Sequence, residues 1–413
     1  MSAVGSTARL AAIAAIVWAL VACDTGGSTS QSSPSGTPSA QAWPTGGPLA
    51  VYDGSAPNAS SHMVSVVGFN KAVGPNGTAQ VIASVTVPRR TDISFKGPCF
   101  WPCAGATDPL YVSTSKSHVY VLDGNATVDM LTPNGSLTKV TSIPGTETAR
   151  AAFAVSPDDS QIAVGLIDFV SLVSTLYVEK LRGGEHVDVL TRSGGHFYWP
   201  IGWRGSQILL ATGTNTGTLL NPYAASGYAL IDPNAAAQPV ALGTGDCVPT
   251  GTVNGAGTAC LAHFGSPCLE DPVSNATSTY YYSCLRRVSW SGSETNFLLP
   301  SNAYTSAFTV GNAALSPDGQ VIMTDQLGRV LAPLSDTHGG NSFLGSSSAS
   351  VQSTLRLGWI SNELFPTTVV SSDGTSTQSI VALNPPHYNA TRGVPFAGAA
   401  PIGSLVGTLP GGL

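Results

Sequence analysis

The feature that most constrains this chain is a strand–turn–strand unit that recurs along its length. Residues 152–165 (AFAVSPDDSQIAVG) and 312–325 (NAALSPDGQVIMTD) share one pattern: an apolar strand, a Ser-Pro-Asp turn and a second strand rich in β-branched residues. Proline fixes φ at the first central position of such a turn, and aspartate can hydrogen-bond back to the backbone. Gly319 then supplies the positive φ that the reversal demands. Each unit is therefore expected to be a β-hairpin.

A second pair of segments, Ile201–Gly213 and Leu357–Val369, keeps the same outline and carries Trp203 and Trp359 before the turn. Aligned on their second strands, neighbouring units are spaced by roughly 45 residues, and a period of that size with several strands per unit is typical of β-propeller blades. We expect the two tryptophans to pack between blades. An array of β-sandwiches is the alternative, because Ser-Pro-Asp-Gly is a common turn.

Further strands are predicted between and around these units. They are His118–Leu122, Val128–Leu131, Leu137–Ile143, Met63–Phe69, Ala79–Val87 and a C-terminal strand Ile402–Leu409. No helix is predicted after residue 23. The expected fold is all-β: a propeller of seven blades, with six or eight as alternatives, whose ring is closed by the C-terminal strand.

The Ser-Pro-Asp-Gly hairpins resemble the WD40-like repeats of the TolB type. The resemblance extends over the body of the chain, but only two units carry the motif well and no Trp-Asp dipeptide occurs. It implies a β-propeller and leaves the activity open, because one fold serves many functions.

The N-terminus indicates export. An apolar run, Leu10–Ala22, ends at Cys23; as a helix it would reach only about 20 Å, too short to cross a bilayer but typical of a signal peptide. Ordinary cleavage after Ala22 would require a small residue where Leu20 stands. Leu20-Val21-Ala22-Cys23 resembles the lipobox of bacterial lipoproteins, which implies that Cys23 carries palmitate-type acyl chains and holds the protein at the cell membrane, outside the cytoplasm.

Composition divides the chain into three predicted parts: the lipoprotein signal peptide (1–22), a disordered Gly/Ser/Thr/Pro-rich tether (23–48) and the propeller domain (49–413). Hydrophobic residues make up 42% of the chain, enough for a large core, whereas charged residues make up only 10%. The net charge is −6 and the 17 basic residues are scattered, so nucleic acid is excluded as a partner.

Six more cysteines follow Cys23: Cys99, Cys103, Cys247, Cys260, Cys268 and Cys284. An even number in an exported chain predicts disulfides. The simplest pairing joins sequence neighbours, Cys99–Cys103, Cys247–Cys260 and Cys268–Cys284, and many other pairings are possible. A metal site is the alternative, but no CxxC pair occurs and no histidine stands at ligand spacing. We therefore predict neither a metal nor a cofactor.

No catalytic motif stands out in the sequence, which contains neither GxSxG nor HExxH. Asp158, Asp159 and Asp318 each fall in a predicted turn that explains them. The aromatic cluster His196-Phe197-Tyr198-Trp199 is the one candidate ligand site, with His196 and Trp199 as its binding residues.

Two functions remain open at this point. The favoured one is a membrane-anchored, extracytoplasmic lipoprotein whose propeller is a non-catalytic binding or scaffolding module for an envelope protein or a glycan. The alternative is an exported hydrolase or lyase acting on polysaccharide, peptide or lactone. Titratable side chains converging on the central channel from several blades would favour the enzyme, and a lining of hydroxyl and apolar groups would favour binding.

Overall fold

The computed structural model describes residues 42–55, 59–69, 79–89, 110–144, 149–168, 170–214, 225–235, 238–243, 247–249, 253–262, 284–298, 313–324, 329–331, 342–343, 358–370, 376–384, 389–390, 394–395 and 403–411. They belong to one compact unit, Gln41–Leu413. The predicted signal peptide and Cys23 lie outside the described residues.

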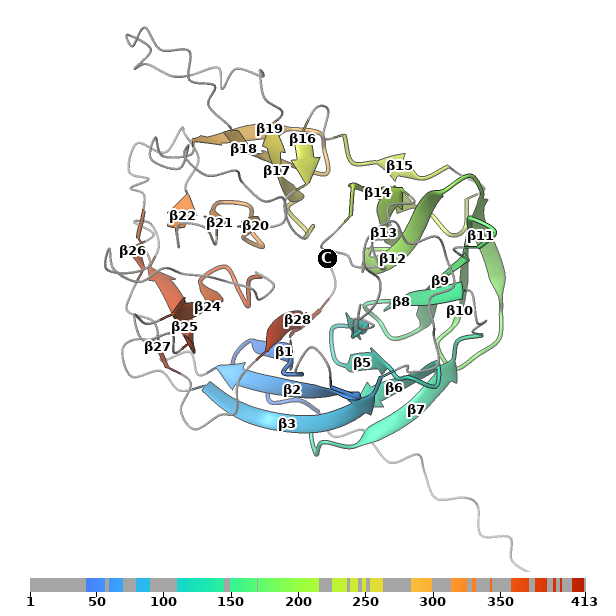
Figure 1. Cartoon of the computed structure of the whole chain (residues 1–413), viewed down its shortest axis with the longest axis horizontal. Helices are drawn as coiled ribbons and strands as arrows, with labels where there is room; N and C mark the ends of the chain where they lie inside the picture. The colour runs from blue at the N-terminus through green and yellow to red at the C-terminus, as the bar shows by residue number, and fades with distance from the viewer. Residues whose placement is uncertain are drawn as a thin grey trace, which may run out of the picture. The chain divides into compact units, whose positions relative to one another are not determined.

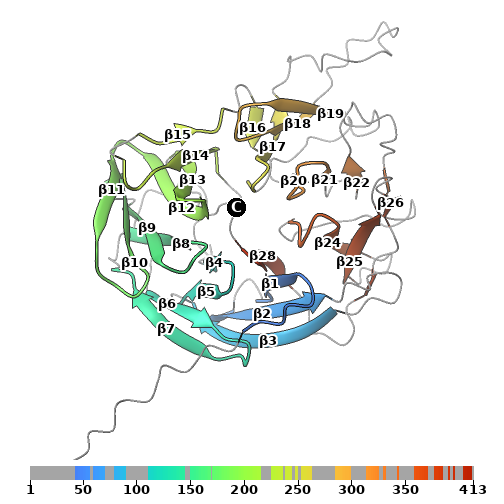
Figure 2. The ribbon, with the colours of Figure 1, turned by 180° about the vertical axis from the view of Figure 1, so that it is seen from behind.

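The unit is an all-β propeller of four-stranded antiparallel sheets, which follow one another around a common centre (Figures 1 and 2). Five sheets are the most regular, and the first consists of β1 (Leu49–Asp53), β2 (Ser61–Phe69), β3 (Ala79–Pro88) and β28 (Ser404–Leu409). The second consists of β4 (Val112–Thr114), β5 (Val119–Leu122), β6 (Thr127–Leu131) and β7 (Leu137–Ser142), and the third of β8 (Ala149–Val155), β9 (Gln161–Asp168), β10 (Val173–Lys180) and β11 (Val187–Arg192). The fourth consists of β12 (His196–Arg204), β13 (Gln207–Thr214), β14 (Gly227–Ile231) and β15 (Val240–Ala241), and the fifth of β16 (Cys247–Pro249), β17 (Thr258–Ala262), β18 (Cys284–Val288) and β19 (Glu294–Leu298).

Two more sheets are built mainly from shorter strands. Their members are β20 (Ala313–Leu315), β21 (Ile322–Thr324), β22 (Arg329–Leu331) and β23 (Ser342–Phe343); and β24 (Leu364–Val370), β25 (Ser376–Asn384), β26 (Asn389–Ala390) and β27 (Val394–Pro395). The described residues contain no helix, and in consequence none that could span a membrane. The predicted all-β propeller is confirmed.

The first sheet joins the two ends of the folded unit. β28 pairs antiparallel with β1, and Leu49 lies opposite Leu409. The C-terminal strand predicted from the sequence therefore completes the sheet that the early strands begin, and it covers an edge of β1 that would otherwise be exposed.

Trp43 belongs to the folded unit, although the composition around it predicts a tether as far as residue 48. Its side chain is 8% exposed and lies in a core cluster with Val51, Leu131 and Leu409. Burying an indole of this size stabilises a fold by about 2 kcal/mol. The compact unit accordingly begins at Gln41, before the predicted boundary at residue 49.

The two Ser-Pro-Asp segments form the hairpins that the sequence predicts. Val155 of β8 pairs with Ile162 of β9, and Leu315 of β20 pairs with Ile322 of β21. The segment 357–369 departs from its predicted strand–turn–strand outline: residues 358–363 are not a strand, because the backbone N–H of Ile360 donates to the carbonyl of Leu364 and closes a tight turn before β24.

Trp203 and Trp359 join neighbouring sheets, as predicted. The indole N–H of Trp203 donates to the carbonyl of Ala154 in β8 over 2.9 Å, and that of Trp359 donates to the carbonyl of Ala314 in β20 over 2.9 Å. Both rings are buried. Each ring therefore fills the space between two sheets while its polar atom is satisfied by the innermost strand of the preceding sheet.

Candidate functional site

A cavity among the described residues lies where the innermost strands of three neighbouring sheets end. β4, β8 and β12 are followed by short turns that contain Lys116, Pro157 and Gly205 respectively. These turns converge on a cavity of about 730 Å³, a size typical of small-ligand sites. Asn234, Pro410 and Gly411 complete its wall.

Hydroxyl, amide and apolar groups dominate this wall. The lining residues are Lys116, Ser156, Pro157, Asp158, Ser160, Gln161, Trp203, Gly205, Ser206, Asn234, Pro410 and Gly411. Only two of them carry charge, Lys116 and Asp158. We call this the turn cavity.

The Asp158 carboxylate is tied into its own turn. It accepts hydrogen bonds from the hydroxyls of Ser156 over 2.6 Å and Ser160 over 2.8 Å. These bonds lower the pKa of the Asp158 carboxyl below its ordinary value, against the opposing effect of burial. Asp158 is therefore an ionised turn residue and is poorly suited to donate a proton at neutral pH.

Ser156 is the centre of the same turn. Its hydroxyl is buried, donates to Asp158 and accepts from the backbone N–H of Gln161 over 2.9 Å. The rim of the turn cavity is thus held in place by hydrogen bonds within the hairpin, which keeps the cavity preformed.

Asp159 links this hairpin to the sheet before it. Its carboxylate accepts hydrogen bonds from Ser117 over 2.7 Å, from His118 Nδ1 over 2.8 Å and from the Tyr120 hydroxyl over 2.8 Å. Burial would raise the pKa of the Asp159 carboxyl, but the hydrogen bonds from His118, Ser115, Ser117 and Tyr120 outweigh it and lower the pKa to about 2. The sequence assigned Asp159 to the turn alone and missed this contact.

Ser117, His118 and Asp159 do not form a nucleophile–base–acid triad. The serine hydroxyl and the carboxylate both contact the same ring nitrogen, His118 Nδ1, over 3.0 and 2.8 Å. A triad needs the base to meet its two partners through opposite ring nitrogens. This cluster therefore fastens two sheets together, and we assign it no catalytic role.

The predicted ligand residues His196 and Trp199 are separated by the structure. His196 is exposed and lines a cleft of about 260 Å³ beside Tyr198 and Tyr228. Trp199 is 2% exposed and lies in a core cluster with Phe197 and Tyr228. Because the side chains of a strand alternate between its two faces, residues three apart point in opposite directions. His196 and Trp199 therefore lie on opposite faces of β12, and their ligand role stays a prediction.

The cysteines are described only in part. Cys260 is buried and disulfide-bonded, which agrees with the expected chemistry. Cys247 and Cys284 lie in β16 and β18, on either side of the strand that carries Cys260. Cys99, Cys103 and Cys268 lie outside the described residues, so the pairing remains a prediction. Within the described ranges, no group of three His, Cys, Asp or Glu side chains is arranged to hold a metal ion.

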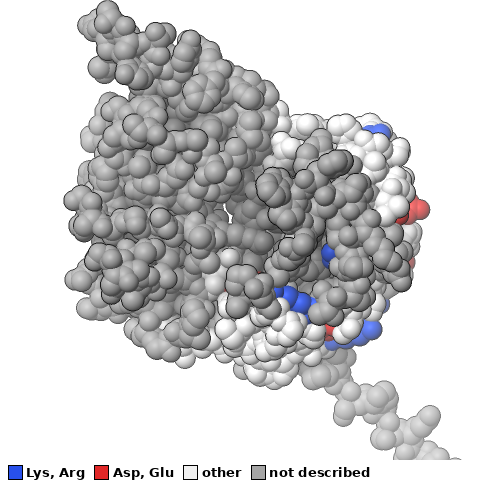
Figure 3. Space-filling model, viewed as in Figure 1, with Lys and Arg blue, Asp and Glu red and all other residues white. Residues whose placement is uncertain are grey.

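Charged side chains are sparse on the described part of the face in Figure 3, where isolated Lys, Arg, Asp and Glu residues lie among uncharged ones. This agrees with the low charged fraction of the chain, 10%. Uncharged residues therefore predominate on the described part of this face.

Comparison with known proteins finds similarity in fold only. No family model and no curated protein matches the sequence. Similar solved structures include an oligogalacturonate lyase from Vibrio parahaemolyticus (TM-score 0.48, 9% identity, 83% of this chain and 92% of that one) and an oligogalacturonate lyase in complex with manganese (0.45, 8%, 83% and 92%). Prolyl oligopeptidase B from Galerina marginata is similar at a TM-score of 0.40 and 13% identity, over 81% of this chain and 45% of that one.

Proposed function

We propose that this protein is a membrane-anchored, extracytoplasmic lipoprotein whose propeller is a non-catalytic binding module. The observation that carries the binding role is the lining of the turn cavity: hydroxyl and amide groups from two neighbouring sheets line it, and its one carboxylate, Asp158, is held by its own turn. Such a lining favours binding over turnover.

The chemistry of the lining defines a class of ligand. Hydroxyls such as that of Ser206 and amides such as those of Gln161 and Asn234 can both donate and accept hydrogen bonds. They complement a neutral polar ligand, a glycan or an extended peptide segment, better than an ion. Pro157 and Pro410 add apolar surface. A glycan or an envelope protein is the partner we propose for this cavity.

We also assign one blade to each four-stranded sheet, which gives the ring seven blades. An experimental structure of the protein would test this number through the rotational pseudo-symmetry of the ring. A ring with a different rotational pseudo-symmetry would overturn the assignment without affecting the ligand site.

The membrane anchor is tested at Cys23. Cys23→Ser removes the sulfur that would carry acyl chains, so we expect the variant to leave the membrane fraction while the wild-type protein stays there. Mass spectrometry of the N-terminal peptide checks the modification directly. Equal retention of the two proteins in the membrane would contradict the anchor.

The binding role is tested by filling the turn cavity. Ser206 is exposed at its rim, and Ser206→Trp places an indole in the opening. The matched control is Ser171→Trp, at an exposed position in the β9–β10 turn. We expect the full chain to bind members of a glycan or peptide panel, and Ser206→Trp alone to lose this binding.

The same panel separates the two functions. Products released by the wild-type protein, and lost in Ser206→Trp, would overturn the non-catalytic role and establish the hydrolase or lyase predicted as the alternative. Binding without product, equally strong in both tryptophan variants, would place the site elsewhere and contradict the role of the turn cavity.

A further inference from the structure

A buried carboxylate in the second sheet lacks a partner among the described residues. Asp129 is the middle residue of β6 and has 9% of its surface exposed. In the part of the chain that the structure describes, its carboxylate makes no hydrogen bond and no ion pair. Buried carboxylates are normally paired or hydrogen-bonded, because an ionised group loses its hydration on burial. The charge of Asp129 is therefore expected to destabilise the fold.

The register of the sheet shows where the Asp129 side chain is directed. Asp129 lies opposite Val121 of β5 and two residues before Leu131, so these three side chains share one face of the sheet. Val121 and Leu131 belong to a core cluster that extends into the first sheet. The β3 side chains in or against this cluster are apolar: Ile82, Ala83, Val85 and Val87. Asp129 therefore faces the first sheet, and these β3 side chains offer it no hydrogen bond.

Two charged residues flank Asp129 on the same face. Asp123 follows Val121 by two residues, and Lys139 of β7 is paired with Asp129 in the sheet. Lys139 is exposed and forms no ion pair with Asp129. Asp129 thus has a like charge beside it and an opposite charge that stays in solvent.

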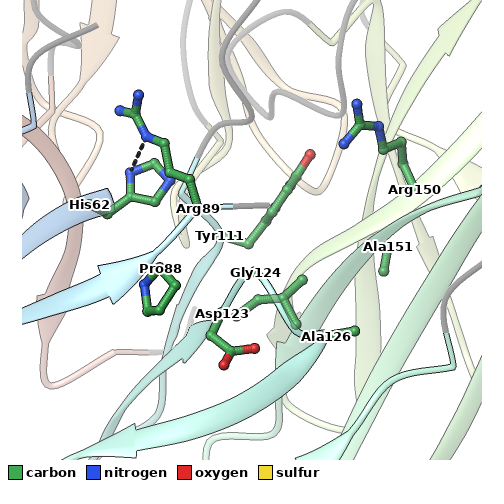
Figure 4. A pocket seen from close by; sticks show the side chains of 10 residues that line it. His62, Pro88, Arg89, Tyr111, Asp123, Gly124, Ala126, Arg150 and Ala151 are labelled. Carbon is green, nitrogen blue, oxygen red and sulfur yellow. Dashed lines mark hydrogen bonds between the residues drawn. The ribbon is translucent and has the colours of Figure 1, made fainter. Parts of the chain in front are cut away.

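The arginines described near Asp123 do not neutralise its charge. Its Oδ1 accepts hydrogen bonds from the backbone N–H groups of Asn125 over 2.9 Å and Thr127 over 2.8 Å. It also lines a small pocket whose other charged or titratable residues are His62, Arg89, Tyr111 and Arg150. Figure 4 shows the Asp123 carboxylate turned away from both arginines, and His62 contacts Asp53 over 3.0 Å. The like charge beside Asp129 therefore persists.

We propose that Asp129 makes the joint between the first two sheets sensitive to pH: the ionised carboxylate loosens the packing of these sheets, and the protonated form strengthens it. Burial and the charge of Asp123 raise the pKa of the Asp129 carboxyl above its ordinary value of 3.8, and Lys139 opposes them. The folded chain therefore holds this proton more tightly than the unfolded chain. The destabilisation appears as the pH rises above about 4 and is absent at lower pH. Because the first sheet joins both ends of the folded unit, the effect acts beside the closure of the ring.

The test compares the full wild-type chain with Asp129→Asn by urea denaturation at several pH values. Asparagine has nearly the same shape as aspartate but no charge, so the variant should gain stability relative to wild type as the pH rises. We expect the ratio of the two unfolding constants, wild type over variant, to increase at least about threefold from about pH 4 to about pH 8. Glu363→Gln is the control: it removes a charge at an exposed position in the turn before β24, and its ratio should stay constant. A constant ratio for Asp129→Asn as well would overturn the proposal.

Asp123→Asn tests the like charge without changing Asp129. The asparagine oxygen can still accept from the turn, so the variant should fold and should show a smaller loss of stability between about pH 4 and about pH 8 than wild type. This variant also supplies an independent measurement if Asp129→Asn does not fold. In the double variant the gain at neutral pH should be less than the sum of the two single gains. Additive gains would contradict the interaction of the two carboxylates.

Hydrogen exchange at one pH locates the effect in the molecule. At about pH 7 the backbone amides of β3 and β6 should exchange more slowly in Asp129→Asn than in wild type, and those of β24 and β25 should be unchanged. Slowing that is spread evenly over all sheets would mean that Asp129 acts on the whole fold, and it would overturn the assignment to this joint.

Discussion

The two Ser-Pro-Asp hairpins, residues 156–161 and 316–321, share their first three residues and differ in the three that follow. In each, the buried serine hydroxyl donates to the aspartate two residues later over 2.6 Å. It also accepts from two backbone N–H groups, those of residues 160 and 161 in the first turn and those of residues 320 and 321 in the second. The next position is Asp159 in one hairpin and Gly319 in the other, both with positive φ, 61° and 72°.

The difference shows two ways of docking one turn on the preceding sheet. Asp159 reaches that sheet with its side chain, which accepts from His118 and Tyr120. Gly319 reaches it with its backbone: its carbonyl accepts from Arg287 Nη1 over 2.8 Å, and a Cβ at Gly319 would lie 2.9 Å from the Cβ of Ala256. The turn motif is therefore shared, and the contact between sheets is specific to each pair.

Making the second turn like the first should have the largest effect. Gly319→Asp adds a Cβ against Ala256 and Arg287 at a positive φ, so we expect a loss of about 2–3 kcal/mol in the free energy of unfolding. Chemical denaturation measures it. Gly292→Asp is the control, because Gly292 has a φ of 81° and nothing within 4 Å of its added Cβ, so only the backbone cost of about 1 kcal/mol applies. Equal losses of stability in Gly319→Asp and Gly292→Asp would contradict the close approach of Gly319 to Ala256.

Making the first turn like the second should have a smaller effect. Asp159→Gly relieves the positive φ but removes the acceptor of Ser117, His118 and Tyr120, and we expect a net loss of about 1–2 kcal/mol. The variant Tyr120→Phe removes the hydrogen bond that the Tyr120 hydroxyl donates to Asp159, and so tests that contact. If the two residues interact, the double variant will lose less stability than the two single losses added together. Additive losses would contradict the link between the sheets.

A feature of the fold could be predicted from the sequence where the residues that form it lie close together along the chain. The hairpins, and the packing of Trp203 and Trp359 between sheets, could be predicted because turn chemistry and the repeat lie within short segments of the chain. The turn cavity could not, since ring closure brings Lys116, Asn234 and Pro410 together from distant parts of the sequence.

Two segments show what the structure adds to the local sequence pattern. Trp43 stands in a Gly/Ser/Pro-rich stretch that predicts a tether, yet one buried indole is enough to bring that part of the stretch into the fold. His196 and Trp199 were considered together as an aromatic cluster, and the two-residue period of a strand places them on opposite faces of β12. Their ligand role stays a prediction.

The low pKa of Asp159 predicts a smaller, pH-dependent effect. Its pKa is about 2 in the folded protein, below the ordinary value of 3.8, so the ionised carboxylate stabilises the fold at pH values above the ordinary value. That contribution is lost as the pH falls from about 4 through about 2, and amounts to about 1–2 kcal/mol after allowance for solvent screening. Urea denaturation of wild-type protein and Asp159→Asn over this range measures it. Parallel stability curves for the two proteins would refute the assignment.

The smallest effect is expected where the two hairpins are alike. The described hydrogen bonds of the Asp158 and Asp318 carboxylates lie within their own turns: each accepts from the serine hydroxyl and from the backbone N–H two residues later, and Asp158 also accepts from the Ser160 hydroxyl. Asp158→Asn and Asp318→Asn keep an acceptor oxygen in both places, so each should cost less than about 1 kcal/mol, and the two losses should agree. Thermal unfolding of both variants checks this. Unequal losses would mean that one of these aspartates also takes part in docking, and the contrast between the hairpins would no longer rest on Asp159 and Gly319 alone.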